Sequence, residues 1–358
     1  MPKNTFAEFS QIKQPLIGKQ LQALLKQQRV EARAQNKLYY DLIKQLSKLI
    51  GRGGKRMRPL LCLLAYESYG GRKKAIMRVA ASQELLHTFF LIHDDIIDRD
   101  YHRWNGNNIL GVYFERYSQT MDAREALHAA EAQALLAGDV CAAMANEALL
   151  ASSFPAELLV EAQRLQQQTI VTEVGGEVAD TAYPYSDSMP TEAEILRVYR
   201  DKTASYSLKL PLQIGALLAG ASQTELEHLQ QFAYHHGIAF QLQDDLLSMF
   251  GDERKIGKPV GTDLREGTRT VLASRTLEKA SPAARRQFNA LLGSDALDDK
   301  GLAEARTIVI NTGARDYVDA LAHEYTNKSL EFLVKTSMSE AGKKRLIDLV
   351  ALLANRDH

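Results

Sequence analysis

The stretch His93-Asp94-Asp95-Ile96-Ile97-Asp98 ends a long apolar run, Ala75 to Ile97, and contains three closely spaced carboxylates. The run has the periodicity of a helix, in which about 100° per residue puts all three carboxylates on one narrow arc. Carboxylates in apolar surroundings repel one another and are costly to desolvate unless a cation lies between them. A solvated helix face has the same pattern, so this stretch alone does not identify a site.

A second acidic cluster follows in the apolar stretch Phe232 to Phe250. Gln241, Asp244, Asp245 and Ser248 recur there at i, i+3, i+4 and i+7, which is again one helical stripe. Mg²⁺ prefers a few carboxylates together with the oxygens of a bound phosphate. Two clusters of hard oxygen donors therefore predict a divalent metal site for Mg²⁺, with Mn²⁺ as the alternative.

Bulk composition argues against several classes of protein. The 358 residues include 44 Lys and Arg and 44 Asp and Glu, so no net charge favours nucleic acid or an anionic membrane as a partner. Cys62 and Cys141 are too few for a disulfide framework. The N-terminus has no signal-peptide pattern, and no apolar run reaches the ~18 residues that span a bilayer. We expect a cytoplasmic protein without stable membrane insertion.

Almost every segment has the period of an amphipathic helix, and almost none has strand alternation. Helices are predicted over residues 16–49 and 156–174, the second ending at Gly175-Gly176. Thr191 and Ser222 each begin a capping-box pattern that starts a new helix. Because no repeat, linker or composition shift divides the chain, we predict one all-α domain over residues 1–358. It would be a large helical bundle whose acidic stripes face a central cavity.

Basic residues lie beside glycines and beside both acidic clusters. In Gly53-Gly54-Lys55-Arg56-Met57-Arg58-Pro59, three cations precede an apolar helix, where backbone N–H groups and basic side chains are able to bind phosphate. Arg103 follows the first cluster, Lys258 and Arg269 follow the second, and Lys202-Thr203 precedes another apolar helix. This combination predicts a ligand with a polyanionic head and an apolar tail.

Taken together, these motifs resemble those of the trans-prenyl diphosphate synthase (polyprenyl synthetase) family, which makes geranyl, farnesyl and geranylgeranyl diphosphate. The resemblance extends from Gly53 to about Thr270. Its motifs are the basic glycine loop, Asp94-Asp95-x-x-Asp98 preceded by Glu84 and His87, Gly176-Glu177-x-x-Asp180, Lys202-Thr203, Phe240-Gln241-x-x-Asp244-Asp245 and Gly257-Lys258-Pro259. The resemblance implies the all-α isoprenoid synthase fold, a homodimer, and isopentenyl diphosphate and an allylic diphosphate as substrates.

The same resemblance implies a role for each motif residue in ionisation, condensation and elimination. The residues that hold three Mg²⁺ ions would be Asp94, Asp95, Asp98, Asp244 and Asp245. Those that contact the allylic diphosphate would be Arg103, Lys202 and Lys258. Those that hold isopentenyl diphosphate would be Lys55, Arg58 and His87. Metal ions, Lys and Arg neutralise a leaving diphosphate in a dry site. The groups beside the allylic cation would be Thr203, the Lys202 carbonyl and Gln241, so the expected catalytic residues are Lys202, Thr203, Gln241 and Arg103.

Three positions depart from the family pattern. Trp104 stands where the family has a second Arg for the head of isopentenyl diphosphate, and Arg56 is a candidate replacement. Ser248 replaces the last Asp of the second cluster, and Thr268 replaces a common Lys, with Arg269 as a candidate replacement. We expect weaker ligand binding at these positions but retained activity, because the first cluster is intact.

Phe89 and Phe90 lie five and four residues before Asp94, about one turn (~5.4 Å) along the same helix. In the family, bulky groups at these places form the floor that stops the growing chain, although ordinary core aromatics would have the same pattern. Two adjacent rings favour farnesyl diphosphate (C15) over geranylgeranyl diphosphate (C20) as the product.

Three alternatives stay open at this point. A class I terpene cyclase acts on one prenyl diphosphate, and Asp244-Asp245-Leu246-Leu247-Ser248 followed by Asp252 differs from its pattern only by Asp in place of Glu. A cyclase has no use for the residues that bind a second diphosphate. A di-iron carboxylate bundle would use Glu84-x-x-His87 and Glu125-x-x-His128. A non-catalytic subunit of a heteromeric synthase usually loses its acidic clusters, whereas this chain keeps the first one intact.

Overall fold

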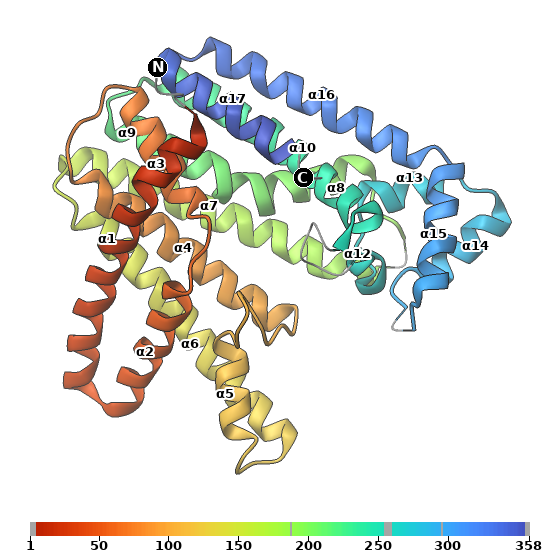
Figure 1. Ribbon diagram of the computed structural model, residues 1–358, viewed down its shortest axis with the longest axis horizontal. Coiled ribbons are helices and arrows are strands. Elements are labelled where there is room, and N and C mark those ends of the chain that lie inside the picture. Colours follow the sequence, from red (N-terminus) through yellow and green to blue (C-terminus); the bar gives the residue numbers. More distant parts are fainter. Residues whose placement is uncertain (1–4, 187, 254–259, 295, 355–358) are drawn as a thin grey trace. The chain divides into compact units, whose positions relative to one another are not determined.

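A computed structural model describes residues 5–186, 188–253, 260–294 and 296–354. These residues form helices joined by loops (Figure 1), and the all-α prediction is confirmed. Within the described ranges, β-structure is limited to an isolated bridge between His102 and Asn107. The chain separates into two compact units, Met1–Arg164 with Ile214–Ala221, and Leu165–Gln213 with Ser222–His358. The expectation of one domain with a central cavity stays a prediction.

The first unit is built on two pairs of packed helices. Its helices are α1 (Phe6–Gln35), α2 (Lys37–Gly51), α3 (Met57–Ser68), α4 (Ile76–Ile97), α5 (Ile109–Tyr117) and α6 (Ala123–Leu150). Helix α2 packs along α1 and α4 packs along α6 (Figure 1). Small residues of α6, among them Ala130, Ala134 and Ala137, are fully buried in the core of this unit. They leave room for the aromatic side chains of neighbouring helices.

The second unit is organised around α10, along which α16 lies (Figure 1). Its elements are η1 (Tyr183–Tyr185), α8 (Glu192–Val198), the π-helix η2 (Tyr199–Lys209), α10 (Gln223–Phe250), α12 (Thr262–Glu266), α13 (Val271–Lys279), α14 (Pro282–Leu291), α15 (Asp299–Asn311), α16 (Ala314–Lys335) and α17 (Glu340–Ala354). Helices α7 (Ala156–Ala182) and α9 (Leu210–Leu218) contribute residues to both units. The core of the second unit includes the buried residues Leu242, Phe288 and Val309.

Two predicted helix boundaries are wrong. The helix expected over residues 16–49 is broken at Asn36, whose extended backbone (φ −164°) ends α1 and whose side chain accepts the Tyr39 N–H at 2.8 Å. An Asn that caps the next helix in this way stabilises the break. Helix α7 does not end at Gly175-Gly176 but continues to Ala182. Glycine is needed at 176 because a Cβ there would lie 2.6 Å from the backbone nitrogen of Lys202.

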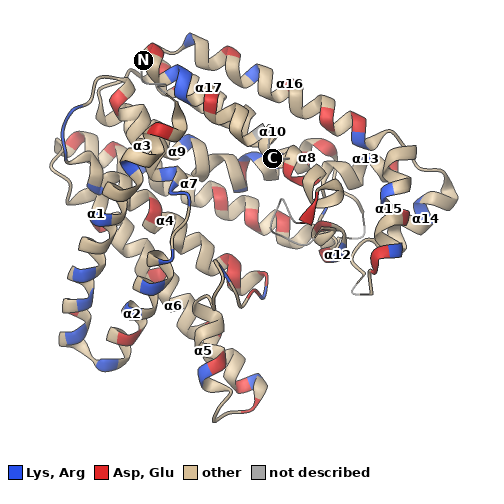
Figure 2. Cartoon of the chain, viewed as in Figure 1, with Lys and Arg blue, Asp and Glu red and all other residues tan. Residues whose placement is uncertain are grey.

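The helix starts predicted at Thr191 and Ser222 are confirmed, and the reciprocal capping box is confirmed at Thr191. Thr191 and Glu194 form a reciprocal capping box at α8. Ser222 caps α10 by accepting the Glu225 N–H, but the Glu225 carboxylate also accepts the Ser337 N–H at 2.8 Å. Charged residues of both signs are spread over the helices of both units (Figure 2). In the described part of the chain, no helix is both long and apolar enough to span a membrane.

Candidate active site

The first acidic cluster lies at the carboxyl end of α4, where Asp98 is the C-cap residue. Asp94 is half-buried, Asp95 is buried and Asp98 is exposed. The helix dipole is negative at this end, so three carboxylates there destabilise one another unless a cation is bound. Asp94 and Asp98 are four residues apart and therefore lie on one face of the helix. As hard oxygen donors in this position, they fit a divalent cation such as Mg²⁺.

Asp95 is bound by Arg103. The guanidinium donates to Asp95 Oδ1 from Nε at 2.8 Å and also from Nη2. Burial raises the pKa of Asp95 to about 6, although the hydrogen bonds and charge of Arg103 oppose this shift. Arg103 begins a tight turn in which its N–H donates to the Gly106 carbonyl at 2.7 Å. Trp104 and Asn105 have positive φ (51° and 59°), as a type I′ turn requires. Arg103 therefore belongs with the first cluster, as the sequence predicts.

The basic glycine loop has a backbone that only glycine adopts easily. Gly53 and Gly54 have φ of 124° and 121°. Arg56 is not presented to a ligand, because its Nη1 lies 2.5 Å from Glu84 Oε1 and its Nη2 donates to the Ile50 carbonyl. This ion pair is nearly buried, with 9% and 4% of the two side chains exposed. That Arg56 replaces the second arginine of the family pattern stays a prediction, and this ion pair argues against it.

His87 lies among the arginines of the first unit. Burial lowers the pKa of His87 well below its usual range, and the positive charges of Arg58, Arg103 and Arg56 lower it further. The ring is therefore neutral at pH 7, and one of its nitrogens carries a hydrogen. A neutral imidazole beside several guanidinium groups suits an anionic ligand, because it donates a hydrogen bond without adding to their mutual repulsion.

Phe89 and Phe90 form a pair of packed rings one turn before the acidic cluster. Their ring centroids are 4.7 Å apart, and Phe89 also packs edge-on against His93 at 4.8 Å. Phe90 is buried, and the half-buried Phe89 packs against the core cluster that contains the alanines of α6. The rings are thus fixed in position relative to the end of α4.

The second acidic cluster lies on α10 in the second unit. Asp244 is half-buried and Asp245 is 2% exposed. Burial and the negative charge of Asp263 raise the pKa of Asp245 well above its usual value. The Tyr199 hydroxyl donates to Asp245 Oδ2, and Gln241 Nε2 donates to Oδ1 at 3.4 Å. A buried and a half-buried carboxylate side by side again fit a cation.

Lys202 and Thr203 lie on the π-helix η2, a rare conformation that often occurs at functional sites. Lys202 Nζ lies 2.7 Å from Glu177 Oε2 and 2.6 Å from Asp180 Oδ2, both on α7. Burial alone would lower the pKa of Lys202, but these two carboxylates outweigh it and raise the pKa above its usual value. The Thr203 hydroxyl donates to Gln241 Oε1 at 3.3 Å. The structure therefore brings Lys202, Thr203, Gln241 and the second cluster into one connected group.

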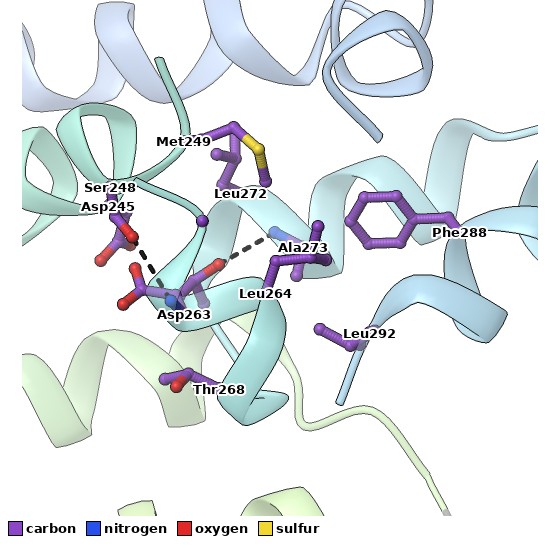
Figure 3. Close-up of a pocket in the computed structure, with 12 residues that line it drawn as sticks. Asp245, Ser248, Met249, Asp263, Leu264, Thr268, Leu272, Ala273, Phe288 and Leu292 are labelled. Atoms are coloured by element: carbon purple, nitrogen blue, oxygen red, sulfur yellow. Dashed lines mark hydrogen bonds between the residues drawn. The ribbon is translucent and has the colours of Figure 1, made fainter. Parts of the chain in front are cut away.

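Ser248 and Thr268 line a small cavity of about 20 Å³ beside Asp245 (Figure 3). Ser248 Oγ accepts the Asp263 N–H at 3.4 Å, which ties the end of α10 to α12. A cavity of this size holds about one water molecule. Arg269 does not line this cavity; its Nε and Nη2 donate to the carbonyls of Tyr183 and Pro184 at 3.4 and 3.2 Å. Lys258 lies outside the described residues.

The predicted site residues that the structure describes are divided between the two units. Lys55, Arg58, His87, Arg103 and the first cluster belong to the first unit, and the lysine–threonine pair and the second cluster belong to the second. Tyr199 was missed by sequence reasoning. Its ring belongs to the apolar core, and nothing in its local sequence indicates that its hydroxyl reaches a carboxylate 46 residues away.

Comparison with known proteins gives consistent matches. The model of the family "Polyprenyl synthetase" matches residues 40–309. The short chain isoprenyl diphosphate synthase of Methanothermobacter thermautotrophicus is 33% identical over 88% of this chain and 91% of its own length. The (2E,6E)-farnesyl diphosphate synthase of Mycobacterium bovis is 30% identical over 85% of this chain and 80% of its own length.

A solved structure agrees with these relatives. The geranylgeranyl pyrophosphate synthase of Corynebacterium glutamicum, complexed with isoprenyl diphosphate and magnesium, superposes with a TM-score of 0.88. It is 27% identical to this chain, and the match covers 98% of this chain and 99% of that one. The matched family model spans well over half of the sequence. The chain therefore belongs to the polyprenyl synthetase family, the trans-prenyl diphosphate synthases.

Proposed function

We propose that this chain is a Mg²⁺-dependent farnesyl diphosphate synthase, which condenses isopentenyl diphosphate with dimethylallyl or geranyl diphosphate. The observation that carries the product length is the packed pair Phe89 and Phe90, one turn before the first acidic cluster. The relatives described above have names that span short-chain, farnesyl and geranylgeranyl products, so their names alone do not choose a length. A rigid aromatic floor favours C15 over C20.

The proposed residues divide the chemistry of the allylic diphosphate between them. Asp94, Asp98 and Asp244 would hold magnesium, which would neutralise the charge that develops on the leaving diphosphate. Asp95 and Asp245 hold the arginine and glutamine beside them in place. Lys202, presented by two carboxylates, binds the diphosphate together with Arg103 and Lys258. The bond between C1 and the bridging oxygen breaks, and its electron pair leaves with the diphosphate.

The second substrate is bound by the basic loop of the first unit. Lys55 and Arg58 pair with the diphosphate of isopentenyl diphosphate, and the neutral His87 donates a hydrogen bond to it. The alkene attacks the allylic C1, which forms the new carbon–carbon bond. The cation that results loses a proton from C2 to the departed diphosphate, because no described side chain of these two groups is an evident base. During these steps the positive charge is stabilised by the oxygens of Thr203, the Lys202 carbonyl and Gln241.

Three alternatives are weaker for separate reasons. Glu84 is paired with Arg56, while Glu125 and His128 are exposed, so neither Glu-x-x-His pattern forms a di-iron site with buried ligands. A terpene cyclase binds one diphosphate and does not require the cluster of Arg58, His87 and Arg103. A non-catalytic subunit would be inactive when purified alone. We also propose a homodimer, which sedimentation of the purified chain would test.

The direct test is an assay of the purified chain with labelled isopentenyl diphosphate, Mg²⁺ and C5, C10 or C15 allylic partners, with products sized by chromatography. We expect C15 product from the C5 and C10 partners and little extension of the C15 partner. Incorporation only with an added partner protein would support the subunit alternative. Release of hydrocarbon from farnesyl diphosphate alone would support a cyclase. Chelation of metal should abolish turnover.

The double substitution Phe89→Ala and Phe90→Ala tests the chain-length assignment. Removing both rings opens space beyond C15, so products should shift to C20 or longer. Truncation of a buried Phe also costs about 3–5 kcal/mol of stability, so melting must be measured in parallel. Phe114→Ala, which truncates a half-buried ring of the same core cluster on α5, is the matched control and should leave product length unchanged. Unchanged C15 output from a folded double variant would remove these rings from the argument.

A further inference from the structure

Four hydrogen bonds form a continuous chain across the second unit, from η2 through α10 to α13. The Thr203 hydroxyl donates to Gln241 Oε1 at 3.3 Å, and Gln241 Nε2 donates to Asp245 Oδ1 at 3.4 Å. The Tyr199 hydroxyl donates to Asp245 Oδ2, and it accepts the Val271 N–H at 3.2 Å. The chain thus links the predicted catalytic threonine to a tyrosine that no motif contains.

Each hydrogen bond in this chain has a defined donor and acceptor in the structure. Gln241 turns its NH₂ toward Asp245 Oδ1 and its carbonyl oxygen toward Thr203. A carbonyl oxygen only accepts, so the Thr203 hydroxyl donates its one hydrogen to Gln241 Oε1. The lone pairs of Thr203 Oγ are then left for other directions. An oxygen that offers lone pairs stabilises a nearby allylic cation, whereas one that offers its hydrogen destabilises it.

Tyr199 holds the far end of this chain. It is 7% exposed and packs in the same apolar cluster as Ile195, Leu242 and Val271. Its hydroxyl accepts the first N–H of α13, a donor that the helix itself cannot pair. Accepting this hydrogen bond polarises the hydroxyl and strengthens the bond that it donates to Asp245. Tyr199 also begins η2, the element that contains Lys202 and Thr203, so its position is coupled to theirs.

We infer that Tyr199 is a positioning residue, which holds Asp245 as the acceptor for Gln241 and thereby turns the lone pairs of Thr203 toward the reacting carbon. This inference rests on the proposed function, because it concerns the ionisation of the allylic diphosphate. It assigns Tyr199 no contact with substrate. Loss of the hydroxyl alone lets Asp245 and Gln241 rotate, and the Thr203 hydrogen is then no longer directed away from the cation.

The test is Tyr199→Phe, which removes one oxygen and keeps the ring in the core. We expect kcat to fall on the order of tenfold, the effect of one hydrogen bond, with the KM for isopentenyl diphosphate within about twofold of wild type. Tyr317→Phe is the matched control. The Tyr317 hydroxyl also donates to a carboxylate, that of Glu192 at 2.9 Å, and its ring packs against the same cluster. It should leave kcat unchanged.

A second background separates positioning from general loss of structure. Gln241→Met breaks the link between Asp245 and Thr203, so adding Tyr199→Phe to it should change kcat by less than about twofold. The same tenfold loss in both backgrounds, or wild-type kcat for Tyr199→Phe, would overturn the inference. If Tyr199→Phe does not fold, Gln241→Glu is tested in its place. This variant puts a second acceptor opposite Asp245, so we expect it to be less active than Gln241→Met. Equal activity of those two variants would overturn the inference as well. An inactive wild-type chain would instead contradict the proposed function.

Discussion

Gly176 lies where α7 closely approaches the backbone of η2. Replacing this glycine with alanine should lower both the stability and the activity of the protein. A Cβ at this position would lie 2.6 Å from the Lys202 nitrogen and 3.1 Å from Lys202 Cα and from the Asp201 carbonyl carbon. All three are backbone atoms, so no side-chain rotation relieves the overlap. Ordinary contact begins at 3.4 Å. Gly176→Ala therefore has to displace Lys202 and Thr203 by about 0.8 Å, and overpacking of this kind costs about 1–3 kcal/mol.

The neighbouring glycine provides the control. Gly175 is exposed on the same helix, and a Cβ there would meet no heavy atom within 4 Å. Gly175→Ala should stabilise the protein by up to about 1 kcal/mol, because alanine is the better helix former. Gly176→Ala gains the same helix propensity, so the difference between the two variants isolates the overlap.

Denaturant unfolding and steady-state kinetics of the two variants measure these effects. Gly176→Ala should be about 1–3 kcal/mol less stable than Gly175→Ala. Its kcat should fall on the order of 100-fold, as expected when a reacting group is misplaced by nearly 1 Å. Gly175→Ala should retain full activity. Equal stability and equal kcat for the two variants would refute the argument that the η2 backbone is held against Gly176.

Two further predictions use other residues. Burial lowers the pKa of His236 to about 4. Because the unfolded chain takes up this proton near pH 6.5, stability should fall by about 3 kcal/mol as the pH drops from about 6.5 to 4. Unfolding of His236→Leu should lack this slope and that of His235→Leu should keep it, and a slope unaffected by His236→Leu would contradict the assignment. Trp104, the one Trp in the sequence, lies against Gly54 of the basic loop, since a Cβ there would be 3.6 Å from the indole. Isopentenyl diphosphate alone should therefore change the tryptophan emission, and Lys55→Ala should weaken this response. A response with the same midpoint in both proteins would argue against binding at this loop.

Sequence reasoning succeeded where the relevant interaction is local. The helical period predicted an all-α chain, and the caps at Thr191 and Ser222 follow from residues three positions apart. The two acidic clusters are also local patterns, since a helix places residues at i, i+3 and i+4 on one face whatever surrounds it. The helix break at Asn36 is local but was not predicted. An Asn inside an amphipathic pattern also occurs within continuous helices, and here it marks a break because the flanking segments pack as two separate helices.

The remaining features depend on partners that are distant in the sequence. Gly175 and Gly176 are adjacent, yet only the second touches another helix, so their local sequence gives no reason to continue α7 through both. Lys202 finds its carboxylates on α7, more than twenty residues away. Such pairings follow from the packing of whole helices, which periodicity does not specify.

The departures from the family pattern show how partners distant in the sequence determine where a cationic side chain is held. Arg56 and Arg269 were the candidates to replace the missing cations at positions 104 and 268. Arg56 is held by Glu84 and the Ile50 carbonyl, and removing it would leave a buried carboxylate without a partner. Arg269 is held by two loop carbonyls. Neither guanidinium is therefore available without breaking a structural interaction. We therefore expect that, in the proposed reaction, binding of the two diphosphates depends more strongly on metal and on the other basic residues than on these two arginines.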